Sequence, residues 1–309
     1  MDIRQLTCFL AVVDHGGFTR AAEHLYIAQP SLSQTIKGME SELGVPLFHR
    51  IGRGVVLSEA GKALVGPARI VLRDLEVARS AAAELSETLS GRLEMIAMPS
   101  PAMEPLATLV AGFTAERPGV RIAVKAAFTP EQVVDAVRQG SAELGLLGTP
   151  EPFRSAAVDV LPLPRQDLVI VLARHSRAFD GLEAVPLAKL SGQPMIASQR
   201  GSLMRQVLDE SLAEGIDLRI VVEAAHRTSI LPLVMADVGH AILPSSWMPM
   251  ARAMGLTALP LDPRPPLHIS LISRTADLTP LAVAFLGHAR EHAREEGPDG
   301  DELPTPQLG

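Results

Sequence analysis

The chain has 309 residues, 47% of them hydrophobic but only 3% aromatic, and its formal net charge is −7. The length allows about two or three domains, and the acidic balance argues weakly against nucleic acid as a partner. No apolar run is long enough to span a membrane, and the first residues do not resemble a signal peptide, so we expect a cytoplasmic protein. The single cysteine, Cys8, excludes a disulfide within the chain, and its apolar helical surroundings predict a core residue.

The charge is unevenly distributed along the chain. Residues 1–62 carry six basic and six acidic residues and are therefore neutral, whereas the remainder carries the whole net charge of −7. Any contact with nucleic acid would depend on a few placed charges rather than on a broadly basic surface.

Three helices are expected near the N-terminus. The first covers residues 3–14 and ends at Gly16 and Gly17, the second covers residues 20–26 with Thr19 as its cap, and the third follows a short turn. Two helices joined by a short turn form a helix-turn-helix.

The third helix, which runs from about Pro30 to Gly44, has two different faces. Its apolar residues recur at helical spacing and predict one buried face: Leu32, Ile36, Met39 and Leu43. Its other face is polar, small and weakly basic: Pro30, Ser31, Gln34, Lys37, Gly38 and Ser41, with Ser33 at the flank. Such a face fits the DNA major groove, where Gln pairs with adenine and Lys reaches phosphate or guanine. An ordinary solvated helix face is the alternative, and the preceding helix and turn favour DNA.

A hairpin is expected after this helix. Val55 to Leu57 resembles a short strand, with glycines at the turn before it and Arg50 and Arg53 beside that turn. A hairpin tipped with arginines next to a helix-turn-helix is typical of a wing that contacts phosphates or the minor groove. A surface turn with stray arginines is the alternative.

After Ser58, a predicted helix cap, apolar residues follow an a/d heptad pattern over nearly four heptads. The seam positions are Leu64, Ala68, Val71, Leu75, Ala78, Ala82, Leu85 and Leu89. We expect a dimerisation helix, with a bend or a late start at Gly66 and Pro67. A helix packed on its own domain is the alternative.

From Arg92 onward, strands alternate with helices, which indicates an α/β fold with parallel sheets. The predicted strands are 92–98, 120–126, 143–148, 158–163, 168–173, 194–198, 218–223, 240–244 and 267–272, and the predicted helices are 103–116, 130–140, 202–214, 227–237 and 279–296. This region is too long for one small sheet, so two subdomains are expected. Residues 297–309 are rich in Pro, Gly and acid and are expected to be a disordered tail.

The chain resembles the LysR-type transcriptional regulators over nearly its whole length. The resemblance is most specific in "LTCFLAVVDHGGFTRAAEHL", "QPSLSQTIKGMESELGVPLFHR" and "VVLSEAG", and it extends to "FTAERPGVRI" at 113–122 and "VGHAILP" at 238–244. Ser58 stands where the family usually has threonine, and Glu143 where an aspartate is usual. The segment "RHSRAF" at 174–179 stands where His-Pro is usual.

The resemblance implies the division of the chain. We expect a winged helix-turn-helix over 1–58, a dimerising linker helix over 59–90, and a two-lobed effector-binding region over 91–296. The effector-binding region would resemble periplasmic binding proteins and consist of two Rossmann-like α/β subdomains. Its first lobe would comprise 91–163 and 266–296, and its second lobe 164–265.

The resemblance also implies partners and contact residues. The family commonly forms homodimers and homotetramers, binds double-stranded DNA and a small-molecule effector, and changes contacts with RNA polymerase. Matching positions suggest that DNA is contacted by Thr19, Arg20, Gln29, Pro30, Ser31, Ser33, Gln34 and Lys37, with Arg50 and Arg53 from the wing. No cofactor is implied.

An effector is expected between the lobes, at loops that follow strands and open helices. The candidate residues are Ser100, Ser198, Gln199, Gly201, Ser202, Arg227 and Thr228, with Thr129 and Thr149 as weaker candidates. Ser and Thr also cap helices without any ligand, which is the alternative for each. Arg200 and Arg227 favour an anionic effector.

Two other protein classes were weighed against a regulator. No nucleophile elbow, phosphate loop or paired cysteines occurs, so no catalytic residue is proposed. The segment "HAREH" at 288–292 matches a zinc-hydrolase pattern, but a third ligand is not evident, and a solvated final helix is favoured over a metal site. Residues 92–296 alone would suit a solute-binding protein, but the preceding 90 residues and the lack of a signal peptide argue against it.

Overall fold

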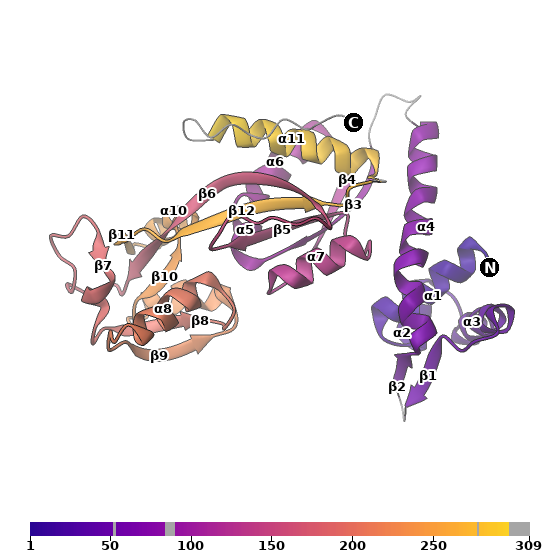
Figure 1. The fold of residues 1–309 in the computed structure, drawn as a ribbon, viewed down its shortest axis with the longest axis horizontal. Helices are drawn as coiled ribbons and strands as arrows, with labels where there is room; N and C mark the ends of the chain where they lie inside the picture. Colours follow the sequence, from indigo (N-terminus) through magenta and orange to yellow (C-terminus); the bar gives the residue numbers. More distant parts are fainter. Residues whose placement is uncertain (52–53, 84–89, 277, 297–309) are drawn as a thin grey trace.

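The computed structural model describes residues 1–51, 54–83, 90–276 and 278–296. Figure 1 shows an N-terminal bundle joined by a long helix to a larger α/β body. The bundle consists of α1 (Ile3–His15), α2 (Phe18–His24) and α3 (Gln29–Leu43), the antiparallel strands β1 (Phe48–Ile51) and β2 (Gly54–Leu57), and the start of α4 (Glu59–Ala83). The predicted helix-turn-helix and its hairpin are both present.

Local caps set the limits of these helices. The Asp2 side chain accepts a hydrogen bond from the Gln5 backbone at the start of α1, and Gly44 ends α3 with a left-handed φ of 71°. Thr19 does not cap α2, contrary to the sequence prediction. The helix begins at Phe18, because the Gly17 carbonyl already accepts the Ala21 N–H over 3.1 Å.

The core of the bundle forms where the apolar face of α3 meets α1. Leu32, Ile36 and Met39 are each at most 1% exposed and pack in one cluster with Phe9, as the helical pattern predicted. Leu43, expected on the same face, is the last residue of α3 and is 38% exposed.

The long helix α4 contributes to the same core. Ala68 is 1% exposed, and Leu64 and Leu72 pack against the bundle, so the first heptad positions serve this domain rather than a dimer interface. The helix begins at Glu59 and continues through Pro67, so the late start is wrong. Val71 is exposed, whereas Leu85 and Leu89 lie outside the described residues.

The α/β body contains strands β3 to β12. The strands are β3 (Gly91–Ala97), β4 (Val120–Ala126), β5 (Leu144–Thr149), β6 (Asp159–Leu172), β7 (Val185–Pro186), β8 (Pro194–Ser198), β9 (Arg219–Ala224), β10 (Ala241–Pro244), β11 (Thr257–Asp262) and β12 (Pro266–Ser273). The helices are α5 (Pro99–Met103), α6 (Leu106–Glu116), α7 (Pro130–Arg138), α8 (Leu203–Ala213), α9 (Ile230–Met235), α10 (Met248–Ala253) and α11 (Pro280–Glu296), with the short 3-10 turns η1 (Leu187–Leu190), η2 (Arg227–Ser229) and η3 (Ser245–Trp247).

The main sheet has the strand order β4-β3-β5-β12-β6-β11-β7, with β10 also paired to β6. It is a mixed sheet, so the expectation of parallel sheets is wrong in part. The pairs β3–β4, β3–β5 and β8–β9 are parallel, but β12 runs antiparallel to both β5 and β6. The last strand returns from the far end of the body, and this reversal produces the antiparallel pairs.

Two α/β subdomains share the strands β6 and β12, which run through both (Figure 1). The first subdomain is built on β3, β4 and β5 with α5, α6, α7 and α11, and the second on β7 to β11 with α8, α9 and α10. Strand β6 replaces the two predicted strands 158–163 and 168–173 and passes through the predicted boundary at 163 and 164. No described helix is both long and apolar enough to cross a bilayer.

Candidate functional site

The polar face of α3 points away from the core of the bundle. Pro30, Ser31, Gln34 and Lys37 are exposed, opposite the buried Leu32 row. Gln29 is also exposed, and its Nε2 donates to the half-buried Ser33 hydroxyl over 2.8 Å. The six α3 residues predicted to contact DNA therefore form one surface: Gln29, Pro30, Ser31, Ser33, Gln34 and Lys37.

The hairpin is fixed to α3 by a carboxylate. Glu40 Oε1 accepts hydrogen bonds from the backbone N–H groups of Leu47 and Phe48, over 2.7 and 3.2 Å. The Phe48 ring packs on Phe9 and Phe18, with ring centroids 5.5 and 5.6 Å apart. Both contacts hold the wing at a set position beside the exposed face of α3.

The other residues predicted to contact DNA belong to α2 and the hairpin, and one of them lies outside the described residues. Thr19 and Arg20 are exposed on α2, where Arg20 Nη2 donates to the Gly16 carbonyl over 3.0 Å. Arg50 lies on β1 opposite Val55. Arg53 lies outside the described residues.

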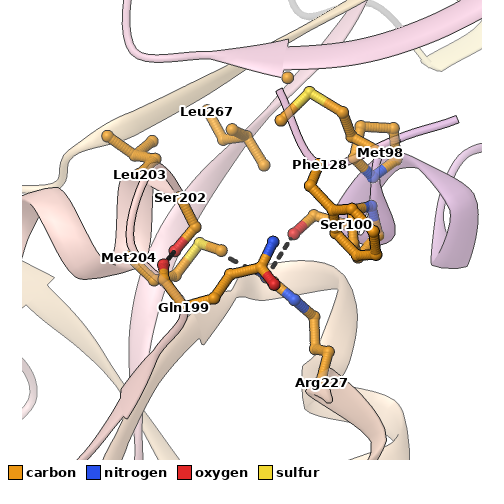
Figure 2. Close-up of a pocket in the computed structure, with 12 residues that line it drawn as sticks. Met98, Ser100, Phe128, Gln199, Ser202, Leu203, Met204, Arg227 and Leu267 are labelled. Carbon is orange, nitrogen blue, oxygen red and sulfur yellow. Dashed lines mark hydrogen bonds between the residues drawn. The ribbon is translucent and has the colours of Figure 1, made fainter. Parts of the chain in front are cut away.

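A narrow cleft lies between the two subdomains of the α/β body (Figure 2). Ser100, at the start of α5, faces Arg227 of η2, and Gln199 and Ser202 line the same cleft from the start of α8. Arg227 Nη1 donates to Ser100 Oγ over 2.6 Å, which joins the two subdomains. The cleft has a volume of only about 20 Å³.

Arg227 is the dominant electrostatic feature of this cleft. Burial lowers the pKa of its guanidinium to about 10, so the side chain remains charged at neutral pH. Within the described part of the chain, no carboxylate forms an ion pair with it, and its Nη1 contacts are Ser100 Oγ and Met204 Sδ. A buried cation without a counter-ion favours an anion at this position.

The remaining predicted effector residues do not line the cleft. Thr129 caps α7 by accepting the Gln132 N–H, and the Thr149 hydroxyl donates to the Glu151 carbonyl over 2.6 Å. Ser198 is 3% exposed and its hydroxyl has no partner among the described residues, while Gly201 and Thr228 line neighbouring hollows. Ser202 lines the cleft and also caps α8.

Two family models match the chain. The LysR substrate binding domain matches residues 86–294, and the bacterial regulatory helix-turn-helix protein, lysR family, matches residues 3–62. The chain belongs to the LysR family of transcriptional regulators.

This LysR-type regulator is 32% identical to the HTH-type transcriptional regulator IlvR of Caulobacter vibrioides, over 93% of this chain and 96% of that protein. It is 29% identical to the dual regulator OxyR of Escherichia coli, over 89% of this chain and 90% of that protein. The structure of full-length CbnR in complex with its target DNA is similar, with a TM-score of 0.67 and 25% identity over 95% of this chain and 100% of CbnR. The family comprises DNA-binding transcription regulators with an effector-binding domain, not enzymes.

The sequence analysis missed the apolar walls of the cleft in this LysR-type regulator. They are formed by Met98, Pro99, Pro101, Phe128, Leu203, Met204 and Leu267. The predicted residues are polar, whereas Phe128, which lines the cleft, is apolar and directly precedes the predicted Thr129 in the loop after β4.

The zinc-hydrolase pattern is part of the final helix of this LysR-type regulator. His288 packs against the ring of Phe113, and a Cβ on Gly112 of α6 would lie 2.9 Å from the imidazole. Among the described residues, no group of three His, Cys, Asp or Glu side chains is placed to hold a metal ion. The imidazole of His288 thus belongs to the packing between α6 and α11.

Proposed function

We propose that this LysR-type regulator binds promoter DNA through α3 and the wing, and that a small anionic effector held at Arg227 changes this binding. The DNA part is supported by the separation of faces on α3, where Ile36 is 1% exposed and Gln34 and Lys37 are exposed. An α-helix anchored in this way enters the major groove, and its polar residues meet base edges and phosphates. Thr19, Arg20, Arg50 and Arg53 would add contacts to the DNA backbone and minor groove.

The regulator acts as a homodimer or homotetramer in this proposal. Val71 of α4 is exposed, although the neighbouring Leu72 packs on the bundle. In this proposal the heptad pattern that continues after Val71 carries the dimer seam. Paired recognition helices then meet half-sites about one helical turn, or a multiple of it, apart. The DNA-bound dimer works in the cytoplasm and contacts RNA polymerase.

The observation that supports an anionic effector is the half-buried Arg227, which lacks a carboxylate partner among the described residues. Arginine presents several donors, so it can bind a carboxylate while Ser100, Gln199 and Ser202 supply further polar groups. The effector would replace the bond between Arg227 and Ser100 and thereby shift the relative position of the two subdomains.

A contact between α4 and the first subdomain offers a route to the DNA. Arg73 of α4 is 9% exposed, and a Cβ on Gly140 would lie 3.1 Å from its Nη1. The neighbouring Glu143 is buried, and its carboxylate accepts a hydrogen bond from Thr279 at the start of α11 over 2.5 Å. A movement of the first subdomain would therefore move α4, to which the DNA-binding bundle is attached.

Gel shift and footprinting on the protein's own promoter region test the DNA part. We expect a shift at nanomolar protein, and Gln34→Ala should weaken binding most at particular bases. Exposed Gln206→Ala, on α8, is the matched control and should leave the shift unchanged. The absence of a protected operator would overturn the proposal.

Calorimetry with matched acidic and neutral metabolites tests the effector part. The acidic compounds should bind more tightly, and Arg227→Gln should remove that preference while promoter binding persists. A neutral compound that binds tightest, or an unchanged preference in Arg227→Gln, would contradict an anionic effector.

A further inference from the structure

A second, larger hollow lies next to the cleft and is also lined by Arg227. Its volume is about 610 Å³, compared with about 20 Å³ for the cleft itself. Small-molecule sites typically measure about 300–1,000 Å³, and a space of about 10–15 Å³ holds one water molecule. In this arrangement of the subdomains, only the larger hollow can accept the body of a ligand.

The larger hollow is mostly apolar and is formed by both subdomains. Its lining residues are Pro99, Ala102, Met103, Phe128, Ala225, His226, Arg227, Thr228, Leu231, Pro232, Trp247, Met250 and Met254. We call it the Met–Trp hollow, after Met103, Met250, Met254 and Trp247. Methionine side chains are flexible and polarizable and adapt to apolar ligands of irregular shape.

Three residues line both spaces, which are therefore adjacent: Pro99, Phe128 and Arg227. Pro99 and Phe128 belong to the first subdomain, whereas Arg227 belongs to the second. A ligand whose acidic group binds Arg227 at the cleft can therefore extend directly into the Met–Trp hollow. Among the described residues that line this hollow, Arg227 and His226 are the only ones with an ionisable side chain.

We propose that the effector is a carboxylate with a large apolar body, whose acidic group binds Arg227 and Ser100 and whose body occupies the Met–Trp hollow rather than the cleft. This inference rests on the proposed function, because it requires an anionic effector at Arg227. It restricts the effector class to aryl or branched and longer alkyl carboxylates. Small hydrophilic acids would leave the apolar walls of the hollow in contact with water.

Calorimetry on the full-length protein with three probes tests the ligand class. The probes are 4-phenylbutyrate, its neutral amide, and butyrate, which has the acid but lacks the ring. We expect 4-phenylbutyrate to bind at least tenfold more tightly than either of the others. If butyrate bound as tightly as 4-phenylbutyrate, the apolar body would have no role in binding. If the amide bound as tightly as 4-phenylbutyrate, the negative charge would have no role.

Two tryptophan variants test where the body lies. Ala225→Trp fills the Met–Trp hollow from an exposed position, and Leu203→Trp fills the cleft. Ala225→Trp should weaken 4-phenylbutyrate binding tenfold or more, and by a larger factor than Leu203→Trp. The matched control is Ala213→Trp, at an exposed alanine of the same subdomain outside both spaces, which should retain wild-type affinity.

The outcomes separate this inference from the proposed function. The Met–Trp hollow would be overturned as the effector site if Leu203→Trp weakened 4-phenylbutyrate binding more than Ala225→Trp did. It would also be overturned if the wild-type protein shifted its promoter but did not bind 4-phenylbutyrate. Failure of the wild-type protein to shift its promoter would overturn the proposed function itself.

Discussion

Arg227 of the second subdomain donates a hydrogen bond to Ser100 of the first over 2.6 Å. The bond spans the cleft, and Ser100 is 4% exposed. It therefore stabilises the closed arrangement of the two subdomains.

Ser100→Ala should loosen this closed arrangement. A hydrogen bond to a charged group contributes about 1.5–3 kcal/mol, and its loss leaves Arg227 with fewer partners. We expect faster amide hydrogen exchange in segments 98–103 and 226–230. Ser191→Ala, at an exposed serine of the second subdomain, is the control. Equal exchange in Ser100→Ala and wild type would show that the bond does not hold the subdomains together.

Lys37 and Gln34 should affect DNA binding in different ways. Lys37→Ala should lower affinity on all sequences and reduce the slope of log affinity against log salt by about 1, because one phosphate contact is lost. Gln34→Ala should cost about 1–3 kcal/mol at one base pair and leave the salt slope unchanged. Fluorescence anisotropy on operator and random duplexes at several salt concentrations measures both quantities. Identical salt slopes for the two variants would contradict the assignment of Lys37 to phosphate.

Gly61 should tolerate no side chain. A Cβ there would overlap the Leu47 carbonyl oxygen and lie 2.8 Å from Leu57 Cδ2, so Gly61→Ala must displace the start of α4 from the hairpin. We expect a loss of about 1–3 kcal/mol in the free energy of unfolding. Gly66→Ala, in the same helix with no atom within 4 Å of the new Cβ, should gain up to about 1 kcal/mol. Urea unfolding measures both, and equal values would refute the steric argument.

His240 should make the second subdomain less stable in mild acid. Its Nδ1 accepts the Ala173 N–H over 2.9 Å, and burial lowers the pKa of the imidazole. The unfolded chain therefore takes up a proton more readily than the folded protein. The contribution of neutral His240 to the free energy of unfolding is complete above the pKa of histidine in the unfolded chain, about 6.5. This contribution declines as the pH falls below that value.

His240→Asn should flatten the dependence of unfolding free energy on pH between about 7 and 5. His175→Asn, at an exposed histidine of the same subdomain, is the matched control. If His240→Asn kept the wild-type dependence of unfolding free energy on pH, groups other than His240 would be responsible for the acid sensitivity.

Peroxide should leave promoter binding unchanged. The only cysteine, Cys8, is buried in the DNA-binding bundle, and burial raises the pKa of its thiol. A protonated, buried thiol reacts slowly with oxidants. Alkylation of Cys8 should require unfolding. Fast modification of the folded protein, followed by loss of the gel shift, would contradict this expectation.

Local patterns in the sequence were sufficient to predict most elements. The apolar spacing of Leu32, Ile36 and Met39 identified α3 and its buried side, because each helical turn repeats the same geometry. The heptad pattern of α4 was ambiguous, since an apolar stripe reports burial but not the identity of the partner. Ala68 shows this, because it packs within its own domain.

Features that depend on contacts distant in sequence could not be predicted. Two strands, 158–163 and 168–173, were predicted, yet β6 is continuous from Asp159 to Leu172 because it passes between the subdomains. Strand β11 was missed because Pro260 lies within it, although β11 pairs with both β6 and β7. The Met–Trp hollow was missed because Met103 and Met254 are far apart in the sequence and belong to different subdomains.

The two subdomains are joined by a sheet rather than by loops, and this limits how they can move. Strands β6 and β12 are hydrogen-bonded to each other through the junction, with a shift in register between Leu267 and Ile269. A loop hinge permits wide opening at little cost, whereas a paired ribbon resists shear and bends where its ladder is interrupted. A ligand that binds between the subdomains would therefore bend the paired strands at that irregularity rather than open the cleft widely.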